Sequence, residues 1–242
     1  MRRLVPFVLL AALALPVAGA AGPPLTVFAA VSLSNVFPRI GGGERYSFAG
    51  SDQLALQVRQ GAPADVYAAA SPKYTQLLYR DGLVEKPVVF ATNKLIVLVP
   101  RSNPAHIESV YDLRRPGVKV VLGDSTVPVG IYTRQILDAL GTTADVTKNV
   151  VSQETDVKGI VSKVALGEAD AGFVYRTDAR PVASSTRSIA LPGWAQPPIR
   201  YEIAVVKASK RRGAAAGFIR KVLSKRGRLL LVKGGFGLPK PR

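Results

Sequence analysis

The sequence contains no cysteine and only one histidine among its 242 residues. The absence of cysteine excludes a disulfide framework, a thiol nucleophile, a cysteine-ligated zinc site and an iron–sulfur cluster. A single histidine excludes a metal site built from several imidazoles and leaves His106 as the one candidate for the base of a Ser-His-Asp triad. Because His106 closely follows Asn103-Pro104, it is expected in a solvated loop rather than in a catalytic centre.

The motifs of common enzymes are also missing. No phosphate-binding loop of the type G-x-x-x-x-G-K-[ST] occurs. Ser51 stands in Ala-Gly-Ser-Asp-Gln, which lacks the second glycine of a nucleophile elbow. We therefore expect neither an enzymatic activity nor a cofactor.

Acidic residues are scarce in the last quarter of the chain. Residues 179–242 carry 15 basic side chains and one acidic side chain, Glu202, so most of the net charge of +17 lies there. Such a region suits a polyanion or an acidic cell-envelope surface. An ordinary helix with one buried face fits as well, because Phe218 and Val222 lie between the charges. No recognised nucleic-acid-binding motif accompanies them, so no nucleic-acid partner is expected.

The N-terminus has the three parts of a secretory signal peptide. Arg2 and Arg3 precede an apolar run over residues 4–17, and Ala18-Gly19-Ala20 fits the small-residue cleavage site. The run is shorter than the roughly 20 residues that span a membrane, and no cysteine follows it for lipid attachment. We expect residues 1–20 to be removed and the mature protein to be periplasmic or otherwise extracytoplasmic.

Short apolar runs alternate with helical patterns along the chain. The runs are nearly continuous, as expected for strands buried on both faces of a parallel sheet. They lie at residues 25–30, 66–70, 95–99, 118–122, 171–175 and 203–206. Helices are predicted after Ser71-Pro72 and after Asp156. This alternation predicts an α/β fold, in which ligands bind outside the carboxyl ends of the strands.

Four of the predicted strand-to-helix junctions offer hydroxyl groups or free backbone N–H groups. They lie at residues 31–34, 49–52, 123–130 and 155–157. A helix N-terminus has unpaired N–H groups and a partial positive charge, and it therefore binds anions. Each junction alone fits ordinary helix capping, but the combination of four predicts an anion site.

Six segments stand in order along the chain: VFAAVSL at 27–33, FAGS at 48–51, QGAPADV at 60–66, GD and VPVGIY within 123–132, DV at 156–157, and GEADAGFVYRTDA at 167–179. Together they resemble the periplasmic molybdate-binding proteins of ABC importers, from about residue 25 to the C-terminus. The resemblance implies a two-lobed α/β fold of the periplasmic-binding-protein type II class. In this fold, parallel or mixed sheets are flanked by helices, and the ligand lies in the cleft between the lobes.

The resemblance also implies a division of the chain and a function. Lobe 1 would comprise residues 21–92 and 203–242 and lobe 2 residues 93–202, with hinge strands near 93–100 and 200–206. The protein would capture molybdate, and also tungstate, and deliver it to an ABC permease in the membrane. A monomer is the simplest expectation for such a carrier.

The oxyanion-binding residues that the resemblance implies are neutral hydrogen-bond donors. Ser32 and Ser51 would supply hydroxyl groups, Val129 and Val157 backbone N–H groups, and Tyr175 its phenol. Molybdenum would be bound as molybdate through these same residues. An anion that keeps a proton would point a donor at a donor, so a fully deprotonated oxyanion is favoured.

The chain departs from the family at three places. Residues 36–47 are short for the usual first helix and second strand, Val129 stands where the family often has alanine, and Gly50 stands where it often has serine. Two alternatives follow: the same fold could bind another tetrahedral oxyanion such as sulfate, or the chain could be a basic protein that binds a polyanion or the envelope surface.

Overall fold

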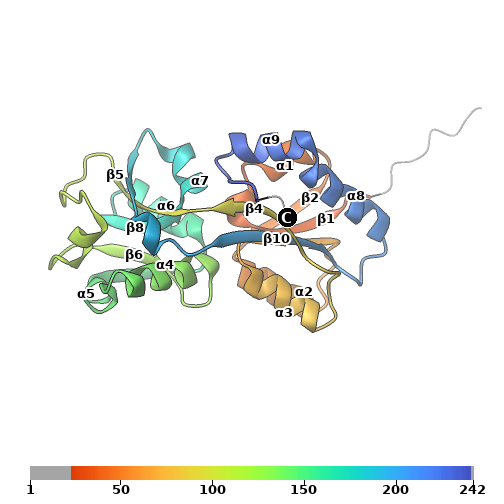
Figure 1. Cartoon of the computed structure of the whole chain (residues 1–242), viewed down its shortest axis with the longest axis horizontal. Helices are drawn as coiled ribbons and strands as arrows, with labels where there is room; N and C mark the ends of the chain where they lie inside the picture. The colour runs from red at the N-terminus through yellow and green to blue at the C-terminus, as the bar shows by residue number, and fades with distance from the viewer. Residues whose placement is uncertain (1–22, 241–242) are drawn as a thin grey trace, which may run out of the picture.

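Two five-stranded sheets, each flanked by helices, make up the protein (Figure 1). The computed structural model describes residues 23–240, and the predicted signal peptide lies outside the described residues. Strands and helices alternate along most of the chain, which confirms the α/β fold predicted from the sequence. We call the unit built on the first sheet the first lobe and the unit built on the second sheet the second lobe.

The first sheet has the strand order β2-β1-β3-β10-β4. Its strands are β1 (Thr26–Ala30), β2 (Arg45–Ala49), β3 (Val66–Ala69), β4 (Val88–Asn93) and β10 (Ile199–Val205). Helices α2 (Ser51–Arg59) and α3 (Pro72–Arg80) cover one side, and α1 (Phe37–Ile40), α8 (Arg212–Leu223) and α9 (Lys225–Lys233) cover the other (Figure 1).

The second sheet has the strand order β7-β6-β8-β5-β9. Its strands are β5 (Leu95–Pro100), β6 (Val120–Gly123), β7 (Val150–Glu154), β8 (Ala171–Tyr175) and β9 (Thr186–Ala190). The α-helices of this lobe are α4 (Pro128–Ala139), α5 (Thr143–Lys148), α6 (Val157–Ala165) and α7 (Arg176–Ala179). Short 3-10 helices complete the two lobes: η1 (Val31–Leu33), η2 (Val110–Arg114), η3 (Arg180–Val182) and η4 (Gly193–Ala195).

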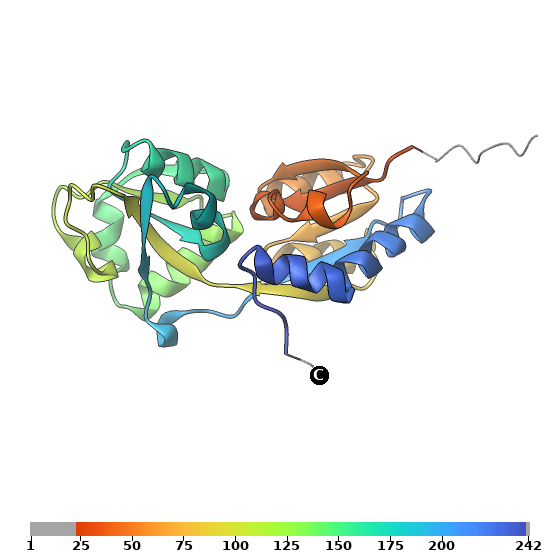
Figure 2. The same cartoon turned by 90° about the horizontal axis from the view of Figure 1, so that it is seen from above.

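The chain passes between the lobes twice, and these crossings explain why the sheets are mixed rather than parallel. Lys94 alone separates β4 from β5, and residues 191–198 lead from β9 to β10. Both connections are visible in Figure 2. Strands β5 and β10 enter their sheets from the side of the other lobe. They therefore run antiparallel to β8 and β3, whose carboxyl ends point toward that side.

Local sequence signals set the ends of the helices as predicted. Ser71 caps α3 by accepting a hydrogen bond from the Lys73 N–H at 3.3 Å, and Pro72 occupies the first helical position. The shortened segment 36–47 contains α1, of four residues, and a turn of three glycines before β2. The first helix is thus shorter than the two turns expected.

Two further predictions concern single elements. In α8, Phe218 and Val222 are buried while the basic residues between them face solvent, which confirms the apolar stripe. His106 is exposed in the loop that follows β5, which confirms its loop position. Within residues 23–240 no helix is both long and apolar enough to cross a membrane.

Candidate functional site

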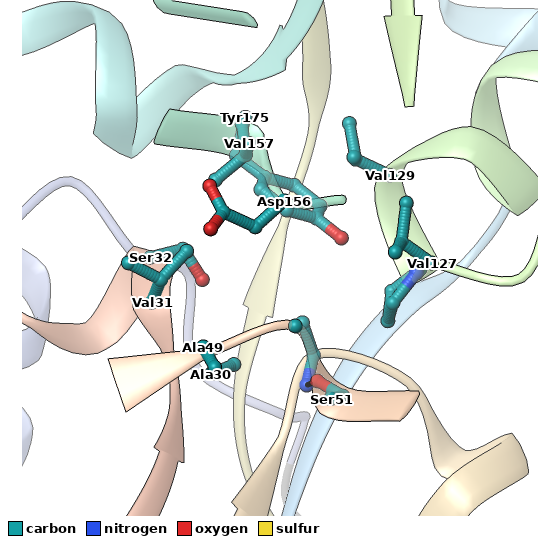
Figure 3. Close-up of a pocket in the computed structure, with 13 residues that line it drawn as sticks. Ala30, Val31, Ser32, Ala49, Ser51, Val127, Val129, Asp156, Val157 and Tyr175 are labelled. Carbon is teal, nitrogen blue, oxygen red and sulfur yellow. Dashed lines mark hydrogen bonds between the residues drawn. The ribbon is translucent and has the colours of Figure 1, made fainter. Parts of the chain in front are cut away.

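A small pocket lies between the lobes, where helices from both begin. All five residues predicted to bind an oxyanion line it: Ser32, Ser51, Val129, Val157 and Tyr175. Figure 3 shows them arranged around one space. The first two come from the first lobe and the other three from the second, so a ligand in this pocket would contact both lobes.

Ser51 is the first residue of α2 and is 1% exposed. Its hydroxyl oxygen accepts a hydrogen bond from the Ala70 N–H at 3.1 Å. Because the oxygen serves there as an acceptor, the hydroxyl hydrogen stays free for a ligand. The side chain is therefore held in place as a donor.

Ser32 lies in η1, directly after β1, and is also buried. Its hydroxyl oxygen lies 2.9 Å from the phenol oxygen of Tyr201, a residue of β10 that is fully buried. The strand end fixes the position of Ser32, and Tyr201 fixes the direction of its side chain.

Two helix N-termini contribute backbone donors from the second lobe. Val129 follows Pro128 at the start of α4, and Val157 is the first residue of α6. The first N–H groups of a helix have no carbonyl one turn earlier to pair with. In α6, the Asp156 carboxylate accepts from the N–H groups of Lys158 and Gly159, at 2.7 and 3.2 Å. The cap thus occupies those two groups and leaves the N–H of Val157 for a ligand.

Tyr175 ends β8 and is 2% exposed, yet its phenol oxygen has no hydrogen-bond partner in the described structure. A buried hydroxyl without a partner costs roughly 1–3 kcal/mol, so this hydroxyl is available to an acceptor that enters the pocket. Burial raises the pKa of Tyr175 well above its usual value. The phenol therefore keeps its hydrogen at physiological pH and is a donor toward the pocket.

The pocket has no positively charged side chain in its lining, and Asp156 is the single charged residue there. The Asp156 carboxylate is directed at the N–H groups of its own helix. Within residues 23–240 no group of three or more His, Cys, Asp or Glu side chains could hold a metal cation. Hydroxyl donors and helix N-termini suit an anion, whose charge they stabilise without a buried cation.

Val31 and Val127 line the pocket within two of the predicted junctions, although no role was expected of either, and Ala70 lies outside all the predicted junctions. These are apolar residues next to the predicted donors, and nothing in their type distinguishes them from core residues. Gly50 departs from the family pattern and lies in the predicted junction at residues 49–52. A Cβ atom at Gly50 would lie 2.8 Å from the backbone carbonyl oxygen of Thr155 in the other lobe, so glycine permits this close approach.

Hydrogen bonds join the lobes on both sides of the pocket. On one side, the Tyr74 hydroxyl donates to the Thr126 carbonyl, and the Thr126 hydroxyl shares its hydrogen between the Asp52 carboxylate of the first lobe at 3.1 Å and Asp124 at 2.9 Å. On the other side, Arg180 donates to the carbonyl oxygen of Lys233, the last residue of α9, and Arg176 donates to that of Gly235 just beyond it, both at 2.9 Å. The structure is thus a closed arrangement of the lobes.

Two α/β lobes, joined by two crossings and closed over a pocket of helix N-termini, define the class of two-lobed solute-binding proteins. The model of the family described as bacterial extracellular solute-binding protein matches residues 44–237. The chain therefore belongs to the bacterial extracellular solute-binding proteins.

Relatives with known names narrow the comparison. The chain is 37% identical over 239 residues to the molybdate-binding protein ModA of Mycobacterium tuberculosis, covering 93% of this chain and 90% of the relative. The structure of the periplasmic molybdate-binding protein of Azotobacter vinelandii is similar with a TM-score of 0.80 at 20% identity, over 89% of this chain and all of that one. The sulfate-binding protein SubI of M. tuberculosis has a TM-score of 0.78 at 19% identity, over 90% of this chain and 88% of that one. The fold is thus shared by proteins named for different oxyanions.

Proposed function

We propose that this protein captures molybdate outside the cytoplasm and delivers it to an ABC permease. The observation that carries the proposal is the phenol of Tyr175, which is buried, unpaired and directed at a pocket that Ser32 and Ser51 also line. A tetrahedral oxyanion would supply the acceptor that this donor lacks. Two relatives that span 93% and 90% of this chain bear the name molybdate-binding protein, which supports this oxyanion over others.

Binding and closure are coupled in this proposal. A ligand stabilises the closed state only by the difference in its affinity for the closed and open states. Here Ser32 and Ser51 come from the first lobe and Val129, Val157 and Tyr175 from the second. The full set of donors therefore exists only when the lobes meet, and the permease would recognise the closed form. No residue of the pocket acts as a catalyst in this proposal.

Neutral donors also favour tungstate, which has the same charge and shape as molybdate. Sulfate is the nearest competing ligand, since it too is fully deprotonated at neutral pH and a sulfate-binding protein shares the fold. Calorimetry with molybdate, tungstate, sulfate and phosphate tests the choice. We expect molybdate and tungstate to bind tightly and phosphate not to bind. Tight binding of sulfate without binding of molybdate would overturn the proposal.

Further parts of the proposal concern the whole chain. We propose lobe boundaries close to those expected from the sequence, residues 21–92 with 203–242 and residues 93–202; the first sheet adds Asn93 and residues 199–202 to the first lobe. We also propose cleavage of the first 20 residues as a signal peptide and a periplasmic or other extracytoplasmic location. The carrier would act as a monomer. Mass spectrometry of the secreted protein and its sedimentation with and without molybdate test these statements.

A second candidate function concerns the surface of α9. Leu229 and Val232 are 54% and 49% exposed there, and they line a groove with Lys225 and Arg228. Ion pairs within residues 23–240 reach Lys221 in α8 but none of the basic residues of α9. Exposed apolar side chains beside unpaired cations suit the surface of an anionic membrane. We propose that α9 binds anionic phospholipid in addition to the function of the pocket.

Vesicles test this second candidate. We expect the protein to sediment with phosphatidylglycerol vesicles and not with phosphatidylcholine vesicles, and high salt should release it. Changing Lys225, Arg226 and Arg228 together to serine should abolish the binding, whereas Ser32→Ala should leave it unchanged. Equal binding to both kinds of vesicle, or none, would remove this candidate.

A further inference from the structure

A chain of buried hydrogen bonds reaches Ser32 from the crossing between the lobes. The phenol of Tyr201 lies 2.9 Å from the Ser32 hydroxyl, and the Asn93 amide nitrogen donates to that phenol at 3.3 Å. The same nitrogen donates to the Thr177 hydroxyl at 3.0 Å. Asn93, Tyr201 and Thr177 are all buried, so these bonds are shielded from water.

The orientation of the Asn93 amide is fixed by its neighbour in the chain. The Lys94 N–H donates to the Asn93 side-chain oxygen at 2.9 Å, which identifies that atom as the oxygen. The opposite end of the amide is therefore the NH₂ group, and its two hydrogens are directed at Tyr201 and Thr177. An amide turned the other way would face the Lys94 N–H with another donor.

The direction of each remaining hydrogen follows from this orientation. The Tyr201 oxygen accepts from Asn93, and an amide NH₂ cannot accept in return. Within the described structure, the one acceptor left for the Tyr201 hydrogen is the Ser32 oxygen. The Ser32 oxygen thus accepts from Tyr201, and the Ser32 hydrogen remains for the pocket that the residue lines.

We propose that Tyr201, oriented by Asn93, is a positioning residue that keeps the Ser32 hydroxyl a donor toward the pocket and so disfavours oxyanions that retain a proton. A hydroxyl free to rotate could accept a hydrogen bond from such an anion. Tyr201 limits that freedom. The Ser32 hydrogen cannot be donated to the Tyr201 oxygen without leaving the buried Tyr201 hydrogen unpaired, and within the described structure it has no other acceptor outside the pocket. This inference rests on the proposed function, since it concerns how the same pocket selects its oxyanion.

Two observations support the assignment. Burial raises the pKa of Tyr201 well above its usual value, so the phenol keeps the hydrogen that it donates. The oxygen of the other serine in the pocket, Ser51, also accepts a hydrogen bond from the protein, because the Ala70 N–H donates to it. Each serine oxygen thus uses a lone pair inside the protein, and within the described structure neither hydroxyl hydrogen has an acceptor outside the pocket.

The variant Tyr201→Phe tests the inference with two anions. Molybdate has no proton at neutral pH, whereas arsenate is tetrahedral and keeps at least one. In Tyr201→Phe the Ser32 hydroxyl can rotate and accept a hydrogen bond. We expect the ratio of molybdate affinity to arsenate affinity, measured by calorimetry, to fall about tenfold or more. Tyr46→Phe is the matched control, because its phenol bonds to the Phe37 carbonyl outside the pocket, and it should keep the ratio of the wild type.

The variant Asn93→Asp tests the same inference in the opposite direction. A carboxylate at position 93 would accept from Tyr201, Tyr201 would then accept from Ser32, and Ser32 would present a lone pair to the pocket. The added charge weakens both anions alike, so the affinity ratio isolates the reversal and should fall further than in Tyr201→Phe.

The results separate this inference from the proposed function. Wild-type ratios in both Tyr201→Phe and Asn93→Asp, with folded proteins by circular dichroism, would overturn the role of Tyr201. A wild-type protein that binds sulfate instead of molybdate would overturn the proposed ligand. The ratio of sulfate affinity to arsenate affinity in the same variants would then decide the role of Tyr201.

Discussion

The hydroxyl of Thr126, in the loop before α4, lies 3.1 Å from the carboxylate of Asp52 on α2 and 2.9 Å from that of Asp124, so its one hydrogen is shared between a contact across the lobes and one within its own loop. The Tyr74 hydroxyl reaches the carbonyl of the same threonine from α3. Neither Tyr74 nor Asp52 is among the residues that line the pocket. These contacts therefore contribute to closure without touching the proposed ligand.

Removal of this lobe contact should weaken binding through the closed state. In Tyr74→Phe we expect the affinity for molybdate to fall by about 2- to 10-fold, the effect of one hydrogen bond. Because the contact forms only on closure, the loss should lie mainly in faster release, which stopped-flow measurements resolve. Tyr79→Phe on the exposed side of the same helix is the control. A slower association with unchanged release would contradict this account.

Removal of the pocket donors should cost more. Ser51→Ala and Tyr175→Phe each delete a buried donor and leave the rest of the pocket in place. We expect each to weaken molybdate binding by about 1–3 kcal/mol, measured by calorimetry. Unchanged affinity in both variants would refute the site.

Serine at position 50 should weaken binding although it adds a hydroxyl donor. A Cβ atom there would meet the Thr155 carbonyl oxygen of the other lobe at 2.8 Å, so the lobes could not close as observed. We expect Gly50→Ser to lower the affinity for molybdate and to leave the thermal stability of the ligand-free protein nearly unchanged. Gly43→Ser is a control, since a Cβ at Gly43 meets no atom within 4 Å. A gain in affinity would show that the hydroxyl matters more than the close approach.

Asp178 should make stability depend on pH. Burial raises its pKa from 3.8 to about 6, and the Lys158 ammonium, 3.6 Å away, opposes that shift in part. Between about pH 4 and pH 6 the folded protein therefore binds more protons at this group than the unfolded chain. Stability contributed by the protonated group is present below this range and is lost as the pH rises through it.

The variant Asp178→Asn removes this dependence. Relative to the variant, the wild type should lose up to about 3 kcal/mol of unfolding free energy between pH 4 and pH 7, since one pKa unit corresponds to about 1.4 kcal/mol. Denaturant unfolding at several pH values measures the difference. Parallel curves for the two proteins would show that Asp178 does not titrate in this range. The constant offset from the lost pairing with Lys158 does not affect the comparison.

Local signals made much of the fold predictable. Ser71-Pro72 and Asp156 mark helix starts because caps depend on residues close in sequence. The edge strand β9 was missed, since Arg187 and Ser188 are exposed there and interrupt any apolar run. The antiparallel direction of β5 and β10 was missed too, because it depends on where the chain crosses between the lobes.

The site likewise combines residues that local motifs predict with a residue that only distant contacts bring there. Ser32 and Ser51 stand in motifs, and their place at the pocket could be predicted from the family resemblance. Tyr201 could not, because its residue type and its apolar strand are equally typical of a core tyrosine. Its contact with Ser32 joins residues 169 positions apart in the chain, and only the packing of β10 against the first strands brings them together.

The bond from Asn93 to Thr177 has a consequence for the open protein. Asn93 belongs to the first lobe and Thr177 to the second, so separation of the lobes pulls on this bond. Once it breaks, one of the two amide hydrogens that fix Asn93 loses its acceptor, and the order of donors up to Ser32 is held less firmly. We therefore expect the open protein to admit oxyanions with little regard to their protonation and the closed protein to reject the protonated ones. Discrimination would then occur after the first encounter, as a failure of the wrong anion to keep the lobes together.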